Sequence, residues 1–255
     1  EAAVVGAAGA GAGLGLGLMR DLAIGAAPDG AEVWSQSDMF VEGISVGAPP
    51  DPLATNGQIW GLPPLNPHDM TRTGFSAFST LLAANMRHAG GMRIDHVMGL
   101  TRLFWVPDGA DGKDGAYVAY PFKDMLGQVT LESNRAQCLV VGEDLGTVPD
   151  GLREPLAEAD VQSSRVLFLE RDGLGFNRPE IYAENALACI STHDLPTFAG
   201  WWEGADLKER AALGIIPAET IDDSLAVREE EKAALVDALV AEKLIADPDG
   251  AVLTA

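Results

Sequence analysis

The sequence is poor in cysteine, with only Cys138 and Cys189 among its 255 residues. Both lie in apolar stretches, AQCLVV and ALACIS, where a buried reduced thiol is the ordinary state. Two cysteines are too few for a disulfide framework, and a zinc site would need more ligands. We therefore expect a cytoplasmic protein without disulfides or structural zinc.

Basic residues are also scarce, because 17 lysines and arginines stand against 38 acidic residues, a formal net charge of −21. Such a charge repels phosphate backbones and anionic lipid headgroups, so we expect neither a nucleic acid nor a membrane as partner. The hydrophobic share of 47% is that of a globular protein, in one large domain or two small ones. The acidic surface itself favours solubility, with adaptation to high salt as the weaker alternative.

A targeting segment and a complete phosphate-binding loop are missing too. Residues 2–19 are uncharged and nominally long enough to span a bilayer, but they are mostly Ala and Gly with no basic segment before them. The glycines at positions 9 to 17 alternate, yet leucine or arginine occupies the place of the third glycine in each possible G-x-G-x-x-G. We therefore expect no membrane helix, signal peptide or dinucleotide site.

Five short apolar runs have nearly continuous hydrophobicity, which predicts buried strands. They are LGLGLM before Arg20, MRI before Asp95, CLVVG before Glu143, VLFL before Glu170 and ALACIS before His193. A helical pattern over residues 75–88 ends at Gly90 and Gly91. Alternating strands and helices predict parallel βα units, in a doubly wound sheet or a (β/α)8 barrel, and the dinucleotide fingerprint of the first is absent.

Acidic residues follow three of these runs: Asp95 in RIDH, Glu143 in GEDLG and Asp194 in THDLPT. In a parallel barrel the C-terminal strand ends form one rim, so these residues can meet in space. Two carboxyl groups about 5 to 5.5 Å apart cleave glycosidic bonds with retention, and a third can hold sugar hydroxyls. A single such residue would more often cap a helix or pair with arginine, but three together favour glycosidic chemistry.

Four motifs in order resemble the amylomaltase, or 4-α-glucanotransferase, family of the α-amylase clan: GAPPDPLATNGQIWGLPPLNP, RIDHVMG, VVGEDLGTVP and THDLPT. The likeness runs from about Leu18 to about Gly204 and is weaker in the helical tail. It implies that Asp95 is the nucleophile, Glu143 the acid and then the base, and Asp194 the stabiliser of the transition state. The implied enzyme transfers α-1,4-glucan segments between maltooligosaccharides by a retaining double displacement.

Other residues are candidates for substrate binding. Arg93 lies on the strand face of Asp95 and could keep that carboxylate ionised, or form a plain structural ion pair. His193 is expected to bond a sugar hydroxyl, with core packing as its alternative, and His96 is less certain. Asp144 is expected to be structural, because its side chain diverges from that of Glu143.

The segment of residues 47–67 holds six prolines and reads as a stiff surface loop. Trp60 offers a flat face for a glucose ring, with Gln58 and Asp51 as polar partners, and the resemblance places this loop over the acceptor sites. Core packing is the alternative for Trp60. Asp21 follows the first expected strand and resembles the family's acidic residue near the donor site, with turn capping as an equal alternative.

A whole barrel of this type has eight strands, and the five here correspond to about the third to the seventh. We therefore expect a fragment: a partial (β/α)8 barrel in residues 1–204, and a helical segment in residues 205–255 that packs on it. Within that segment, residues 225–246 predict an amphipathic helix ending at Pro248. Whether this chain is active alone stays open.

Neither a metal nor a cofactor is expected, since the aspartates of residues 108–115 do not have the calcium-loop spacing. The alternatives to a transferase are an α-glucan hydrolase and a non-catalytic glucan-binding remnant. The preferred glucan length and the oligomeric state stay open.

Overall fold

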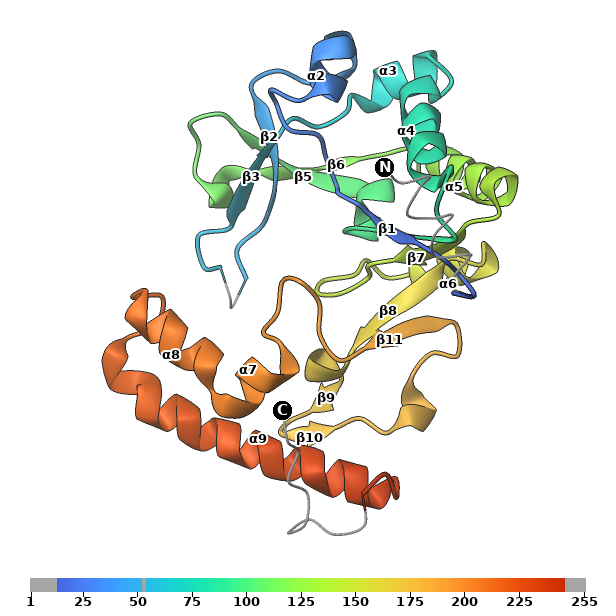
Figure 1. The fold of residues 1–255 in the computed structure, drawn as a ribbon. Helices are drawn as coiled ribbons and strands as arrows, with labels where there is room; N and C mark the ends of the chain where they lie inside the picture. The colour runs from blue at the N-terminus through green and yellow to red at the C-terminus, as the bar shows by residue number, and fades with distance from the viewer. Residues whose placement is uncertain (1–12, 52–53, 246–255) are drawn as a thin grey trace. The chain divides into compact units, whose positions relative to one another are not determined.

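The computed structural model describes residues 13–51 and 54–245 (Figure 1). The chain divides into two compact units, residues 1–163 and residues 164–255. Residues 2–12 of the Ala/Gly run, and the expected stop at Pro248, lie outside the described residues. The division by compactness does not test where the catalytic domain ends, so the boundary at residue 204 stays a prediction.

Five strands form one sheet in the order β1-β4-β7-β8-β11, which is also their order along the chain. Its registers are parallel for β1 with β4, β4 with β7, and β7 with β8. The sheet consists of β1 (Met19–Leu22), β4 (Gly91–Ile94), β7 (Leu139–Gly142), β8 (Gln162–Val166) and β11 (Ala186–Cys189). This arrangement confirms the α/β fold class expected for part of a (β/α)8 barrel.

The core of the first unit lies between this sheet and two helices, α4 (Ser76–Met86) and α5 (Phe122–Ala136). Most residues of β4 and β7 are buried, and both strands are apolar apart from Arg93 in β4. The prediction of a helix over residues 75–88 is confirmed to within two residues at its C-terminal end. The fully or nearly fully buried side chains of this core include Leu82, Met86, Met92, Val129, Val140 and Val141.

Two of the expected strands were misplaced. β1 begins only at Met19, because glycine occupies every second position before it, and Gly17 adopts a left-handed φ of 69°. β8 ends at Val166, the first residue of the VLFL run, and the remaining Leu167–Leu169 form a 3-10 turn. Four of the five residues of β8, QSSRV, are polar, and one of them, Ser163, donates to the buried carboxylate of Asp144, so a search for apolar runs overlooked this strand.

A second sheet, antiparallel and in the order β3-β2-β5-β6, was not expected. It consists of β2 (Ile44–Ala48), β3 (Gln58–Leu62), β5 (Arg102–Pro107) and β6 (Ala116–Ala119). The interpretation of residues 47–67 as a loop was therefore wrong for Gln58–Leu62, which form a strand paired with β2. Gly47 sits at an irregularity of this pairing, where a Cβ would lie only 2.0 Å from the carbonyl oxygen of Gln58.

Short helices complete the first unit. They are α2 (Ala31–Ser35), α3 (Pro67–Arg72) and α6 (Arg153–Glu158), with 3-10 turns η1 (Ser37–Met39), η2 (Val97–Leu100) and η3 (Gly112–Asp114). Asn66 caps α3 by accepting a hydrogen bond from the backbone N–H of His68, and Pro67 fills the first helical position.

The second unit is mainly helical after β11. It contains the hairpin β9 (Arg171–Asp172) and β10 (Gly175–Phe176), the helices α7 (Phe198–Glu203), α8 (Ala205–Ala212) and α9 (Ile221–Ala241), and the 3-10 turns η4 (Leu167–Leu169), η5 (Pro179–Ile181) and η6 (Ala218–Thr220). α9 begins four residues before the expected position, and two aspartates in its first turn favour that start. It ends at Ala241 rather than beyond residue 245.

A buried cation organises the core of this unit. The guanidinium of Arg228 lies 4.9 Å from the ring centroid of Trp201 and donates to the carboxylate of Asp206 at 2.9 and 3.0 Å. It also donates to Glu231 at 3.0 Å. These contacts make Trp201 a packing residue.

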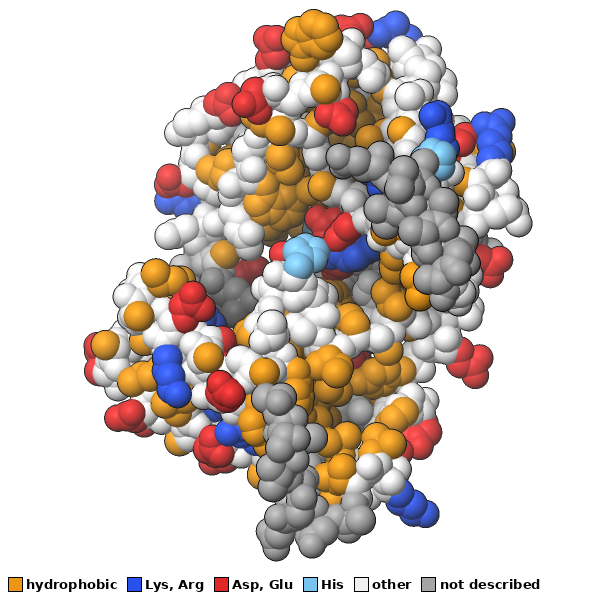
Figure 2. Space-filling model, in the orientation of Figure 1, with side chains coloured by type: hydrophobic (Ala, Val, Ile, Leu, Met, Phe, Trp, Pro, Cys, Tyr) orange, Lys and Arg blue, Asp and Glu red, His pale blue; other side chains and the backbone are white. Residues whose placement is uncertain are grey.

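Acidic side chains are spread over the visible surface (Figure 2), as the net charge of −21 implies. Among the helices of the described ranges, none combines the length and the apolar character needed to traverse a bilayer.

Candidate active site

Asp95 and Glu143 occupy equivalent positions at the C-terminal ends of neighbouring strands. Asp95 directly follows Ile94 of β4 and Glu143 directly follows Gly142 of β7, and Ile94 and Gly142 are register partners. The backbone N–H of Glu143 donates to the carbonyl of Ile94 at 2.9 Å, which continues the parallel ladder to the site. The structure thus brings these two carboxylates to one edge of the sheet.

Arg93 lies between two carboxylates. Its guanidinium contacts Asp95 at 2.8 Å and Asp21 at 2.7 Å, and its side chain is only 14% exposed. Asp21 lies inside β1 as the register partner of Arg93, not after the strand as expected. Burial lowers the pKa of Arg93, but the hydrogen bonds and charges of Asp21 and Asp95 outweigh it, so the pKa is raised overall. Arg93 is therefore a fixed cation against Asp95.

Both carboxylate oxygens of Glu143 accept backbone N–H groups. Oε2 accepts from His96 at 2.9 Å and Oε1 accepts from Leu145 at 2.7 Å. Burial raises the pKa of Glu143, and the charge of Asp95 raises it further, against the lowering by the two N–H groups and Arg93. A carboxyl group with a raised pKa is suited to donate a proton near neutral pH.

Asp144 faces away from this edge and is buried, at 1% exposure. Its carboxylate pairs with Arg153 at 2.7 Å and accepts from the hydroxyl of Ser163 at 2.7 and 2.8 Å. The expectation that Asp144 is structural is confirmed.

The hairpin of β2 and β3 carries Trp60 toward the carboxylate edge. The indole lies edge-to-face against the imidazole of His96, with ring centroids 5.5 Å apart, and its Nε1 donates to Gln58 Oε1 at 3.0 Å. Asp51 lies in the turn between the two strands, where its Oδ1 accepts from the N–H of Ala54 at 2.6 Å. Trp60 therefore contacts His96, which is the residue next to Asp95.

Asp194 and His193 belong to the second unit. They lie in a turn, and Asp194 is five residues past the end of β11 at Cys189, not at the strand end as expected. The turn is held by the N–H of Asp194, which donates to Thr192 Oγ1 at 3.3 Å. The side chains of His193 and Asp194 are 3.4 Å apart and each 67% exposed. Their convergence with Asp95 is a prediction from the family resemblance.

His96 is the site residue that sequence reasoning left undecided. It adopts a left-handed backbone conformation, with φ 44° and ψ 61°, and begins the 3-10 turn η2. Burial lowers the pKa of its imidazole, against the charge of Asp95. Its place directly after a strand-end aspartate is the only sequence signal, and that signal does not reveal the backbone conformation.

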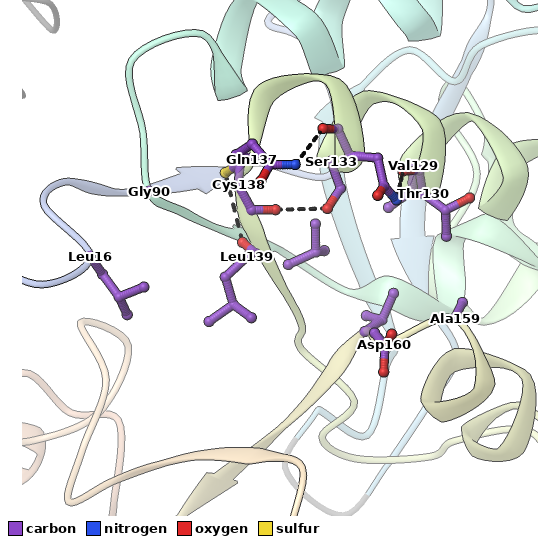
Figure 3. A pocket seen from close by; sticks show the side chains of 13 residues that line it. Leu16, Gly90, Val129, Thr130, Ser133, Gln137, Cys138, Leu139, Ala159 and Asp160 are labelled. Atoms are coloured by element: carbon purple, nitrogen blue, oxygen red, sulfur yellow. Dashed lines mark hydrogen bonds between the residues drawn. The ribbon is translucent and has the colours of Figure 1, made fainter.

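No group of three or more His, Cys, Asp or Glu in the described ranges could hold a metal ion. A cavity of about 350 Å³ lies at the other ends of the strands, by Gly90 before β4 and Leu139 at the start of β7 (Figure 3). Two of its polar side chains already donate to backbone carbonyls: Ser133 to Cys138 at 2.7 Å and Gln137 to Asn134 at 2.8 Å. This cavity is therefore separate from the carboxylate edge.

Parallel strands with carboxylates at their C-terminal ends are the arrangement found at the active-site face of (β/α)8-barrel enzymes. Residues 7–248 match the family model described as 4-alpha-glucanotransferase, glycoside hydrolase family 77. The chain belongs to this 4-alpha-glucanotransferase family.

Relatives and solved structures agree with the family model. The chain is 44% identical to the 4-alpha-glucanotransferase of Haemophilus influenzae, over 86% of this chain and 31% of the relative, and 39% identical to that of Mycobacterium tuberculosis strain H37Rv, over 90% and 32%. It therefore spans about a third of the length of these curated relatives.

Amylomaltase from Corynebacterium glutamicum superposes with a TM-score of 0.91 at 32% identity, over 97% of this chain and 37% of that one. Amylomaltase from Streptococcus agalactiae, solved in complex with acarbose, superposes with a TM-score of 0.65 at 21% identity, over 86% and 45%. The latter shows the shared fold alone.

Proposed function

We propose that this chain carries the reacting carboxylates of a 4-α-glucanotransferase, which moves α-1,4-glucan segments between maltooligosaccharides with retention at the anomeric carbon. The observation that carries the proposal is the pairing at the sheet edge. Asp95, held against Arg93, stands beside Glu143, whose pKa is raised. Retaining glycosidic chemistry needs this difference, an ionised nucleophile beside a protonated acid.

In the first step, a carboxylate oxygen of Asp95 attacks the anomeric carbon of the donor glucan. The glycosidic C–O bond breaks, and Glu143 gives its proton to the departing oxygen. Arg93 stabilises the anionic form of Asp95 before the attack. The products are a free shortened glucan and a glycosyl ester on Asp95.

In the second step, the 4-hydroxyl of an acceptor glucan attacks the same carbon from the opposite side to Asp95. Glu143, now ionised, takes the proton of that hydroxyl, and the ester bond to Asp95 breaks. The number of α-1,4 bonds is unchanged. With water in place of the acceptor, the same carboxylates perform hydrolysis, so the acceptor site decides the outcome.

Trp60 and Gln58 are proposed to bind the acceptor. A tryptophan face stacks on the apolar face of a glucose ring, and the contact between Trp60 and His96 supports a place for that sugar near the reacting carboxylates. Asp51 is proposed as a further polar contact of the same hairpin. The names of the 4-alpha-glucanotransferases that are 44% and 39% identical to this chain support an α-glucan as ligand.

Asp194 is proposed to stabilise the transition state, His193 to bind a hydroxyl of the same sugar, and Asp21 to act near the donor site. We also propose a catalytic barrel domain in residues 1–204, followed by a helical segment in residues 205–255, in a cytoplasmic enzyme that requires no metal.

The experiment is incubation of the full-length enzyme with maltotriose, followed by separation of the products by chain length. Transfer produces both glucose and longer oligosaccharides without a rise in reducing ends, whereas hydrolysis raises the reducing ends. The Asp95→Asn variant is the control and should be inactive. An unaffected Asp95→Asn variant, or saturable binding of maltotriose without any product, would contradict the proposal.

A further inference from the structure

The loop after β4 holds the carboxylate of Glu143 through the backbone of His96. Three hydrogen bonds join the two strand ends: Glu143 N–H to the Ile94 carbonyl, His96 N–H to Glu143 Oε2, and Val97 N–H to the Glu143 carbonyl, each at 2.9 Å. The first and third are backbone bonds that fix where the chain of Glu143 lies. The second reaches the reacting group itself.

The direction of the His96 N–H depends on a left-handed conformation. At φ 44° the residue is in a region where L-residues other than glycine are uncommon, although histidine, asparagine and aspartate are enriched there. The chain turns at this point from β4 into η2, and the turn aims successive N–H groups of residues 96 and 97 at Glu143. An extended residue at position 96 would point its N–H elsewhere.

The imidazole of His96 contacts Trp60 of the hairpin formed by β2 and β3. It is largely buried and contacts the edge of Trp60, so the side chain packs against the hairpin while the backbone bonds Glu143. A ring fixed in this way resists a change of φ at residue 96.

We propose that His96 is a positioning residue that sets the orientation and acidity of Glu143 through its backbone N–H, with its left-handed conformation as the structural requirement. This inference rests on the proposed role of Glu143 as acid and base. The N–H stabilises the ionised carboxylate, and burial opposes it, so the balance leaves Glu143 able both to give and to take a proton. The charged groups of the first unit that act on Glu143 are Asp95 and Arg93.

Four variants separate the backbone from the ring. His96→Gly and His96→Asn introduce residues that readily adopt positive φ, and both remove the imidazole. His96→Val introduces a β-branched residue that cannot hold this conformation without strain, and His96→Ala is a milder form of the same change. Gln137, at φ 52°, provides a matched control pair, Gln137→Gly and Gln137→Val, at a left-handed position before the opposite end of β7.

The measurement is the titration of the Glu143 side-chain carboxyl carbon by NMR in 13C-glutamate-labelled protein, assigned with Glu143→Gln and recorded without substrate. We expect His96→Val to raise the titration midpoint by about one pH unit, the tenfold change in proton affinity expected when a charged acceptor loses one hydrogen bond. His96→Ala should shift it in the same direction. His96→Gly and His96→Asn should leave the midpoint unchanged or lower it, since loss of the ring admits water.

The Gln137 control pair should change thermal stability without moving the Glu143 midpoint. Equal upward shifts in the Gly and Val variants of His96 would assign the effect to the ring and overturn the proposal, and so would the absence of a shift in both His96→Val and His96→Ala. Because the titration needs no turnover, its result is independent of the maltotriose experiment. If the Glu143 midpoint shifts as expected but the maltotriose assay shows no transfer, only the proposed function is contradicted.

Discussion

A Cβ atom placed on Gly142 would lie 2.9 Å from Cγ2 of Val97 and 3.1 Å from its Cβ and Cγ1. Val97 is fully buried, begins η2 directly after His96, and has a stiff β-branched side chain that cannot swing away. Gly142 directly precedes Glu143. The close approach of η2 to the end of β7 therefore depends on the missing side chain at residue 142.

We predict that Gly142→Ala destabilises the protein by about 1 to 3 kcal/mol, the usual cost of forcing extra volume into a packed core. It should also reduce transfer activity, because the displaced turn carries the N–H groups that bond Glu143. Urea unfolding and the maltotriose assay measure the two effects.

Gly127→Ala in α5 is the control, since a Cβ there meets nothing within 4 Å, and alanine should stabilise this helix by about 0.5 to 1 kcal/mol. An equally stable Gly142→Ala protein would refute the packing argument.

Arg93 offers a second prediction, because it bonds Asp21 and Asp95 with different nitrogens of one planar group. Lysine is a point charge on a flexible stem and cannot reproduce both contacts. We expect Arg93→Lys to lower kcat/KM by about 10- to 100-fold, the loss of roughly one charged hydrogen bond in the transition state.

The control for Arg93 is Arg72→Lys, at an arginine that is 65% exposed and pairs with Asp69 on the surface of α3. Exposed pairs of this kind contribute little, so that variant should keep its activity and its stability within about 0.5 kcal/mol. Full activity of Arg93→Lys would show that Arg93 is only structural.

Sequence patterns predicted β4 and β7 well, because most of their residues are buried and both strands are apolar apart from Arg93 in β4. The same criterion failed for β8, where Ser163 bonds the buried carboxylate of Asp144, and for β1, where the ladder begins only after the glycines. Periodicity reports burial, and these two strands are not uniformly apolar.

The antiparallel sheet was missed for a different reason. Prolines dominate residues 47–67 and indicate a loop, yet Gln58–Leu62, between the two proline clusters, pairs with β2. At the site, Asp95 and Glu143 were predictable from their places after apolar runs. The role of His96 was not, since its backbone N–H and its φ of 44° are set by the turn and not by its residue type.

The raised pKa of Glu143 predicts a pH-dependent stability. Folding favours the protonated carboxyl group, so the favourable contribution is complete below the ordinary pKa of 4.5. It is lost as the pH rises from there through the higher folded pKa. Glu143→Gln does not titrate. The free energy of unfolding of wild type, relative to this variant, should therefore fall as the pH rises from about 4.5 through the raised folded pKa, and stay level above it.

Denaturant unfolding of both proteins at a series of pH values tests this sign. A control variant, Glu229→Gln, removes a carboxylate that is 70% exposed in a surface pair with Lys232, where the difference from wild type should hardly change with pH. A relative stability of wild type that rises with pH above about 4.5 would mean that the ionised form of Glu143 is favoured in the fold.

The proposed role of Trp60 in acceptor binding predicts that its loss changes the ratio of transfer to hydrolysis. If its indole binds the acceptor sugar, Trp60→Leu should raise the KM for acceptor by about fivefold, since stacking contacts of an aromatic ring contribute on the order of 1 kcal/mol beyond their buried area. The first step needs no acceptor, so formation of the glycosyl ester should be little affected, and water should capture a larger share of it.

Trp34→Leu is the control, because Trp34 is 85% exposed on α2. The ratio of new α-1,4 bonds to new reducing ends measures the effect. An unchanged ratio in Trp60→Leu would remove Trp60 from the acceptor site and leave it as a packing partner of His96.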